Sequence, residues 1–269
     1  MDYAAQRVCH IESPHSLINN QPRGDAMSYN LIGVGSNAKT VKGDGSEYVT
    51  GIMYLKPFKT IIEGKTFNVC ALAEKAQCHK GCLVSAGRGK MSSVQRGRER
   101  KTVWYHTDRI GFMDALINDI TIFRRRQRKN GVQPCVRLNG TSDILWEKAG
   151  IMEQFPDVQF YDYTKIVARA YKPMPSNYHL TLSYSEADAD YAEQVLTAVR
   201  DTGINAAVVF RDKIPATFKG LRVVDGDKDD LRFLDPQGVI VGLKAKGDAK
   251  HDDTGFVIDV EDDEWLLWI

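Results

Sequence analysis

Three cysteines fall within thirteen residues of one segment, and thiolates this close together in sequence can gather around a metal centre. Seven residues separate Cys70 from Cys78, and three separate Cys78 from Cys82. Glycine reaches positive φ without steric cost, so a glycine-containing loop can wrap around such a centre. The glycines of this segment are Gly81, Gly87 and Gly89. The trio of cysteines therefore predicts a metal site.

Two kinds of centre suit three thiolates. One is an iron–sulfur cluster of the 4Fe–4S type, with one iron open to solvent, to a side chain or to a substrate. The other is a zinc site of the Cys3His type, with His79, His106 or His251 as the fourth ligand. Zinc fingers usually carry two closely spaced ligand pairs, which this segment lacks, so the spacing favours iron–sulfur. Unligated buried thiols are a third interpretation. For the two other cysteines the simplest interpretations are a free thiol in the N-terminal arm for Cys9 and a small core residue at the start of a strand for Cys135.

The composition places these residues in an ordinary soluble chain. It has 269 residues, of which 43% are hydrophobic and 26% charged, and its net charge of +1 creates no field that would demand a nucleic acid or a membrane as partner. No basic leader and no apolar run of membrane-spanning length is present, so we expect a cytoplasmic protein. Five cysteines, an odd number, make a poor disulfide framework. Crowded thiols in a reducing compartment point again to metal.

Strand patterns alternate with helix patterns along most of the chain, which is typical of an α/β fold with a parallel sheet. The expected strands cover 47–55, 65–70, 135–139, 158–164, 179–185, 205–211, 222–227 and 239–247. The expected helices cover 101–130, 142–155 with Ser142 or Asp143 as cap, and 186–203. No dinucleotide fingerprint is present, so we expect a partial or complete (β/α) barrel rather than a doubly wound sheet. The predicted organisation is a weakly ordered arm over 1–27, one domain over 28–260, and an acidic, aromatic tail over 261–269.

Function in such folds collects where strands end and loops begin. The candidate cofactor-binding residues near strand ends are Arg137, Asn139, Asp143 and Lys244. A buried Arg137 must be paired, and Asp143 or Asp162 is a suitable partner; an ion pair and a ligand contact both remain open. Lys244 ends the last strand, where it can receive an anion or stay solvated.

A basic stretch over 88–101 follows the cysteines, and a second basic run ends the helix expected over 101–130. Such runs can contact nucleic-acid phosphates or a host protein, although solvated helix faces explain them equally well. The stretch 88–101 has no aromatic residue on which bases could stack.

Three segments carry a family resemblance: NVCALAEKAQCHKGCLVSAGRGK, CVRLNGTSDILWE and VQFYDYT. In layout they resemble radical S-adenosylmethionine enzymes, and more closely the bacteriophage gene product 88 type, over about residues 29–259. The resemblance implies a radical-enzyme-like partial barrel, an iron–sulfur cluster on the three cysteines, and a host-cell cytoplasmic location. It also sets Asn139 and Asp143 where radical enzymes hold the amine of their cosubstrate. The cysteine spacing is longer than in those enzymes, so binding of S-adenosylmethionine is not a firm expectation.

The sequence thus predicts an iron–sulfur protein, and its alternative is a zinc-stabilised module that binds nucleic acid or a host protein. No nucleophile–base motif, phosphate loop or zinc-protease signature is present, so no catalytic residue is assigned and the sequence does not decide whether the protein is an enzyme.

Overall fold

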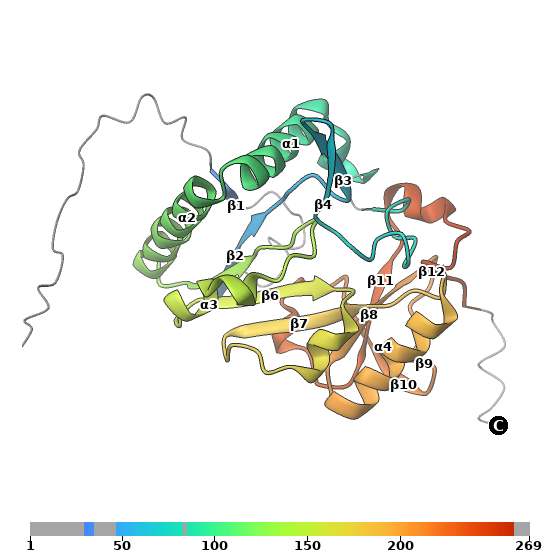
Figure 1. The fold of residues 1–269 in the computed structure, drawn as a ribbon. Helices are drawn as coiled ribbons and strands as arrows, with labels where there is room; N and C mark the ends of the chain where they lie inside the picture. Colours follow the sequence, from blue (N-terminus) through green and yellow to red (C-terminus); the bar gives the residue numbers. More distant parts are fainter. Residues whose placement is uncertain (1–29, 35–46, 83–84, 261–269) are drawn as a thin grey trace, which may run out of the picture.

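The computed structural model describes residues 30–34, 47–82 and 85–260, shown as a ribbon in Figure 1. The arm predicted over 1–27 and the tail predicted over 261–269 lie outside the described residues. No helix in the described part of the chain is long and apolar enough to cross a membrane.

A ten-stranded sheet forms the centre of the fold, in the order β1-β2-β5-β6-β7-β8-β11-β10-β9, with β12 pairing with β8. All neighbours on this path run parallel except the two outermost pairs, β1 with β2 and β9 with β10. The strand bounds are β1 Ile32–Val34, β2 Tyr48–Met53, β5 Gln133–Arg137, β6 Gln159–Thr164, β7 Tyr178–Ser183, β8 Asn205–Phe210, β9 Thr217–Phe218, β10 Leu221–Asp225, β11 Ile240–Lys244 and β12 Val257–Ile258. The α/β class and the parallel sheet are thereby confirmed.

The sheet is open, so a complete barrel is not the architecture of this chain. Closure requires the two outermost strands to pair, whereas β1 and β9 end the path of described strands without meeting. Both end strands are short and antiparallel to their neighbours. Short terminal strands limit the unpaired edge that a sheet presents.

Four α-helices lie in the described part of the chain: α1 Ser92–Thr107, α2 Arg109–Lys129, α3 Ile151–Gln154 and α4 Ala189–Thr202. The prediction of a single helix over 101–130 is wrong about its continuity, because the chain forms two helices, α1 and α2, that meet at Asp108. The Asp108 carboxylate accepts a hydrogen bond from Gly111 N at 2.9 Å, which caps the start of α2. The helix boundary at Asp108 could not be predicted, because the apolar periodicity of the sequence continues across 101–130.

The helix expected over 142–155 is also wrong. It is replaced by a 3-10 turn, η3 (Trp146–Ala149), and the four-residue α3, with Gly150 between them in a left-handed conformation at φ 65°. The other 3-10 segments are η2 Gly87–Lys90, η4 Val167–Tyr171, η5 Arg232–Leu234 and η6 Gly247–His251.

One face of the sheet packs against the helices. Phe112, Leu116 and Ile120 of α2 pack with Val136 and Phe160 of the sheet. A second cluster joins α4 to the strands β7 and β8. The opposite face is covered by η5, where the Phe233 ring meets Tyr48 and Tyr161 edge-on, with centroids 5.2 and 5.4 Å apart. Residues on both faces of the central strands are therefore buried.

A separate hairpin of β3 (Lys59–Ile62) and β4 (Lys65–Asn68) contacts α1 and leads directly into the cysteine segment. The strand expected over 65–70 thus ends two residues before Cys70. In Figure 1 the teal loop that follows this hairpin reaches the red segment of η6.

Candidate metal centre

Cys70 is fixed at the carboxyl end of the sheet by backbone contacts on both sides. Its N–H donates to Asn68 Oδ1 at 2.8 Å, and the carbonyl of Val69 accepts from Asp143 N at 2.7 Å. The side chain is 7% exposed. These bonds place the first thiol beside the loop that follows β5 and the end of β6.

Lys165 directly follows β6 and directs its ammonium group at the thiols. Its N–H donates to Asp143 Oδ2 at 2.7 Å, and its Nζ lies 3.9 Å from Cys70 Sγ. Cys78 also hydrogen-bonds with this side chain. Lys165 was not among the residues predicted from the sequence, although its position immediately after a parallel strand is typical of a functional residue.

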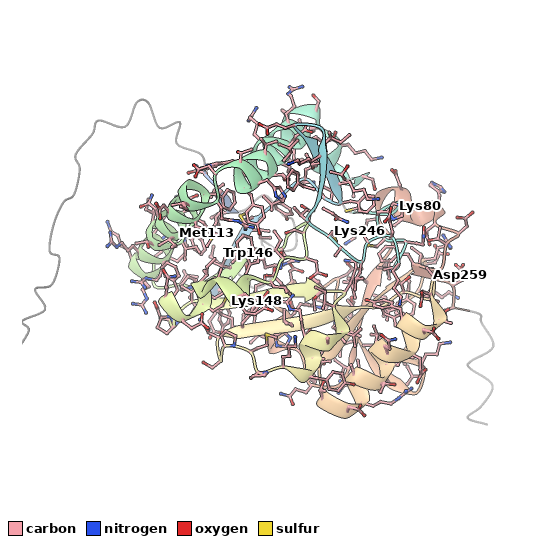
Figure 2. All side chains as sticks on the ribbon, in the orientation of Figure 1. Lys80, Met113, Trp146, Lys148, Lys246 and Asp259 are labelled. Atoms are coloured by element: carbon pink, nitrogen blue, oxygen red, sulfur yellow. The ribbon has the colours of Figure 1, made fainter. Side chains whose placement is uncertain are left out.

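The loop between Cys70 and Cys82 turns back on itself to bring the other two thiols near the first. Cys78 Sγ lies 3.8 Å from the carbonyl of Ala73, and Ser185 Oγ donates to the carbonyl of Ala76 at 2.8 Å, which ties the loop to the end of β7. The carbonyl of Cys82 accepts from both the N–H and the hydroxyl of Ser85 at 2.9 Å. Figure 2 labels Lys80 on this loop.

Burial and charge act in opposite directions on the thiols. Burial raises the pKa of Cys70 to about 11, and Lys165 opposes the rise while the neighbouring thiolates of Cys78 and Cys82 add to it. Burial likewise raises the pKa of Cys78 against the effect of Lys165. The mutual effects show that the three sulfurs share one electrostatic environment. Burial alone would lower the pKa of Lys165, but Cys78, Cys70 and Asp143 raise it well above its ordinary value.

Arg98 of α1 adds a second cation to this environment. Its pKa is lowered by burial, while Tyr54 and Cys82 oppose the fall. The guanidinium carbon lies 4.8 Å from the centre of the Tyr54 ring. Within the described residues, its Nε and Nη1 atoms are buried and have no hydrogen-bond partner. Two cations therefore face the thiols, from α1 and from the end of β6.

The three thiols do not form a closed ligand set for a single ion. No group of three His, Cys, Asp or Glu side chains in the described part of the chain is arranged to hold a metal ion. The histidines considered as fourth ligand are placed by packing: His79 stacks on Phe58 at 5.0 Å, His106 lies 4.2 Å from the Phe67 ring centre, and His251 ends η6. The Nδ1 atom of His79 is 3.1 Å from the carbonyl of Ala73.

Asn139 and Asp143 organise the loop that supports the thiols. Asn139 Oδ1 accepts from the hydroxyl of Ser142, from Ile144 N and from Trp146 Nε1 at 2.8 to 3.1 Å, and its Nδ2 donates to the carbonyl of Ile144. Trp146, labelled in Figure 2, packs beneath α1 with its ring centroid 5.6 Å from that of Tyr105. Ser142 and Asp143, expected to cap a helix, serve this turn instead.

Asp143 connects that turn to the residues after β6. Its Oδ1 accepts from Thr164 Oγ1 at 2.8 Å and pairs with Arg169 Nη1 at 3.4 Å, while its Oδ2 binds Lys165 N. Arg169 also pairs with Glu147 at 2.7 Å. Both candidate cofactor-binding residues of this loop thus have protein partners, and their role toward a cofactor stays a prediction.

Asp162 is a buried carboxylate that the sequence analysis considered only as a partner for Arg137. It accepts from Asn139 N at 2.8 Å and from the hydroxyl of Tyr178 at 3.1 Å. Burial raises its pKa to about 7, although Arg137 and these donors oppose the rise.

Arg137 lies on the opposite face of the sheet from the thiols. Its Nη1 is bonded to Asp230, with both side chains buried, and its guanidinium carbon lies 4.9 Å from the Tyr163 ring centre. The partner is therefore neither Asp143 nor Asp162. Asp230 belongs to the segment that covers this face, a long-range placement that strand alternation could not predict.

The remaining predicted residues are dispersed. Cys135 is fully buried in the middle of β5, where it is a core residue as expected. Lys244 ends β11, away from the thiols, and lines a separate hollow. The basic stretch over 88–101 is not a loop, because residues 92–101 form the first turns of α1. Within it Arg98 is turned inward, whereas Arg96 and Arg100 are exposed.

Comparison with known protein families matches residues 30–260 to the model of Gene product 88. The chain belongs to the Gene product 88 family. No curated protein and no solved structure matches it significantly. The family match spans every element described above, including the cysteine loop, α4 and η6. The family therefore confirms the closer part of the resemblance seen in the sequence.

Proposed function

We propose that Cys70, Cys78 and Cys82 bind an iron–sulfur cluster of the 4Fe–4S type, in which one iron has no cysteine ligand. The observation that carries this proposal is that Cys70 and Cys78 both lie at the ammonium of Lys165, while Cys82 of the same loop acts electrostatically on both of them. Each cysteine of such a cluster binds a different iron, so its sulfurs need not converge on a single point. The open arrangement of the loop suits that requirement.

Charge supports the same proposal. A cluster held by three thiolates carries net negative charge, and a buried anion needs a compensating cation. Lys165 contacts two of the thiols, and Arg98 has buried N–H groups without a partner in the described structure. These two side chains would hold their positive charge against the cluster from two sides.

When bound, the cluster would supply one-electron chemistry and, at the open iron, a Lewis-acidic position. The chain's own contribution is to orient the three thiols, to balance their charge and to limit solvent access. Because burial raises the pKa of Cys70 and Cys78, these two thiols are protonated at neutral pH without metal, and binding must release their protons.

The test is anaerobic purification followed by iron, sulfide and zinc analysis, with visible absorption spectra and electron paramagnetic resonance of the reduced protein. We expect iron and sulfide in nearly equal amounts and a broad brown absorption. Changing Cys70, Cys78 or Cys82 to alanine should abolish both, whereas Cys135→Ala is the matched control that removes a thiol elsewhere and should retain them. Circular dichroism shows which variants remain folded.

Two outcomes would overturn the proposal. Zinc without sulfide, lost in the same three variants, would establish the zinc-stabilised site in its place. Protein that contains neither metal after anaerobic reconstitution with iron and sulfide would leave the thiols without a cofactor.

A further inference from the structure

A second candidate site lies at the carboxyl ends of two other parallel strands, β8 and β11. These strands are direct neighbours, with Lys244 opposite Phe210 in the register. A hollow of about 300 Å³ opens there, lined by Arg211, Asp212, Lys244, Ala245 and Lys250. Hollows at this edge of a parallel sheet are the usual place for ligands.

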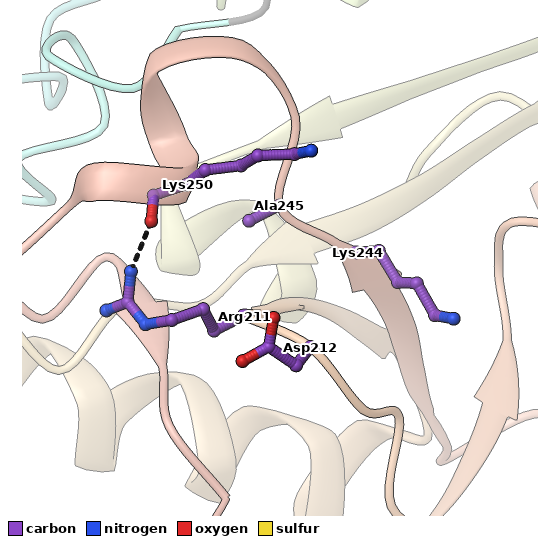
Figure 3. A pocket seen from close by; sticks show the side chains of 5 residues that line it. All are labelled: Arg211, Asp212, Lys244, Ala245 and Lys250. Carbon is purple, nitrogen blue, oxygen red and sulfur yellow. Dashed lines mark hydrogen bonds between the residues drawn. The ribbon is translucent and has the colours of Figure 1, made fainter.

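The guanidinium of Arg211 is held by contacts within the protein and forms one wall of this hollow. Its Nε and Nη2 bind the Asp259 carboxylate, and Nη1 and Nη2 donate to the carbonyls of Lys250 and Asp252, each at 2.7 Å. The bond to the Lys250 carbonyl is drawn in Figure 3. Arg211 therefore fixes η6 over the end of β8, and Asp259 balances its charge.

Unlike Arg211, Lys244 and Lys250 have no ion-pair partner among the described residues. Figure 3 shows the side chains of Lys244 and Lys250 extending from two different elements, with Ala245 between them. No acidic side chain in the described residues pairs with either ammonium. The neighbouring Lys246, by contrast, pairs with Asp227 at 2.8 Å, and Lys90 pairs with Asp248 at 3.3 Å. Asp212 is the one carboxylate among the lining residues.

The geometry points to a binding site for a small phosphate-bearing anion, held by the ammonium groups of Lys244 and Lys250. Lysine binds phosphate as a point charge, and two lysines on separate rigid elements can approach different oxygens of one group. The hollow is at the lower end of the size range of small-molecule sites, which suits a phosphomonoester or a diphosphate. A concave site of this size admits a compact anion in preference to the continuous backbone of a nucleic acid. This proposal does not depend on the cluster.

The test uses inorganic pyrophosphate as the probe, with binding to the full chain measured by isothermal titration calorimetry at low and at physiological ionic strength. We expect the double variant Lys244→Gln, Lys250→Gln to bind at least tenfold more weakly. The matched control is Lys65→Gln, Lys129→Gln, which removes two exposed lysines from the β4 strand and the end of α2 and should change the affinity less than twofold. Thermal unfolding of both variants checks that neither has lost the fold.

The proposal is overturned by either of two results. If the unaltered chain does not bind pyrophosphate, the hollow is not a binding site for it. If both double variants reduce the affinity equally, Lys244 and Lys250 contribute only general positive charge. A parallel titration with a short single-stranded oligonucleotide distinguishes the source of the phosphate. Oligonucleotide binding that depends on Lys244 and Lys250, without pyrophosphate binding, would replace the small-anion site by a nucleic-acid surface.

Discussion

Lys165 Nζ lies 3.9 Å from Cys70 Sγ, where the loop of three cysteines meets the end of β6. An ammonium at this distance favours the thiolate, and burial favours the neutral thiol. Burial outweighs the ammonium, and the pKa of Cys70 lies at about 11. In metal-free protein, the rate at which Cys70 is alkylated therefore depends on its contact with Lys165.

Replacing the ammonium should slow alkylation of the thiols. In metal-free, reduced protein, Lys165→Met removes the group that lowers the pKa of Cys70 and Cys78, so their thiolate fractions at pH 8 should fall. A pKa rise of one unit would slow the reaction about tenfold. Iodoacetamide labelling followed by peptide mass spectrometry measures each cysteine separately. Lys80→Met, which removes an exposed lysine of the same loop, is the control, and equal rates in all three proteins would contradict the assigned contact.

The buried pair of Arg137 and Asp230 should be costly to break. Their side chains are 8% and 5% exposed, so Asp230→Asn leaves a cation buried without a countercharge. Losses of roughly 3–5 kcal/mol in the free energy of unfolding are typical of such changes. Urea denaturation measures the loss. Glu193→Gln, at an ion pair whose side chains are 47% and 69% exposed, should cost less than about 1 kcal/mol. A similar loss in both variants would refute the role given to burial.

Asp162 should make the protein less stable as the pH rises. Its pKa is about 7 in the folded chain against an ordinary value of 3.8, so the folded state holds a proton that the unfolded state has released between these values. Stability then falls as the pH rises from about 4 to 7, by up to about 4 kcal/mol.

Asp162→Asn removes this titration and should flatten the pH dependence. The comparison is the urea midpoint at pH 5 and at pH 8 for both proteins. We expect the difference between the two pH values to be smaller in the variant. An unchanged difference would show that other groups cause the dependence.

Gly81 should resist even the smallest side chain. A Cβ at this position would lie 3.0 Å from Ala249 Cβ and 3.2 Å from Ala249 Cα, on η6. Gly81→Ala should therefore destabilise the chain by about 1–3 kcal/mol, and Ala249→Gly in the same chain should relieve part of the loss. Gly97→Ala is the control, because nothing lies within 4 Å of its added Cβ and alanine favours helix α1 by about 1 kcal/mol. Thermal unfolding of these three variants tests the expected loss of stability at Gly81 and the expected gain at Gly97.

The central strands β2, β5, β6, β7, β8 and β11 could be predicted because each carries its own apolar, β-branched pattern, whereas the short strands β1, β3, β9 and β12 were not predicted. The three thiols could be recognised from spacing alone. The break at Asp108 and the replacement of a helix by η3 and α3 could not, because apolar periodicity continues through both places. Closure of the sheet, the pairing of Arg137 with Asp230 and the approach of Lys165 to Cys70 depend on contacts between distant segments, which local patterns do not encode. Gly81 was expected to supply a positive φ, yet Gly87 has that conformation, at 51°, and Gly81 supplies a close approach.

That close approach joins the segment carrying Cys82 to the segment carrying Lys250. Gly81 has no side chain of its own, so its backbone lies directly against the Ala249 methyl group, and Asp248 N donates to Ser85 Oγ at 3.1 Å beside them; the two segments are therefore held in close contact. Events at the thiols and at the lysines would then be thermodynamically linked. If a ligand at the thiols changes the affinity of the lysines for an anion by some factor, the anion must change the affinity of the thiols for their ligand by the same factor. The absence of a methyl group at Gly81 would in this way couple two sites that lie along the same carboxyl edge of the sheet.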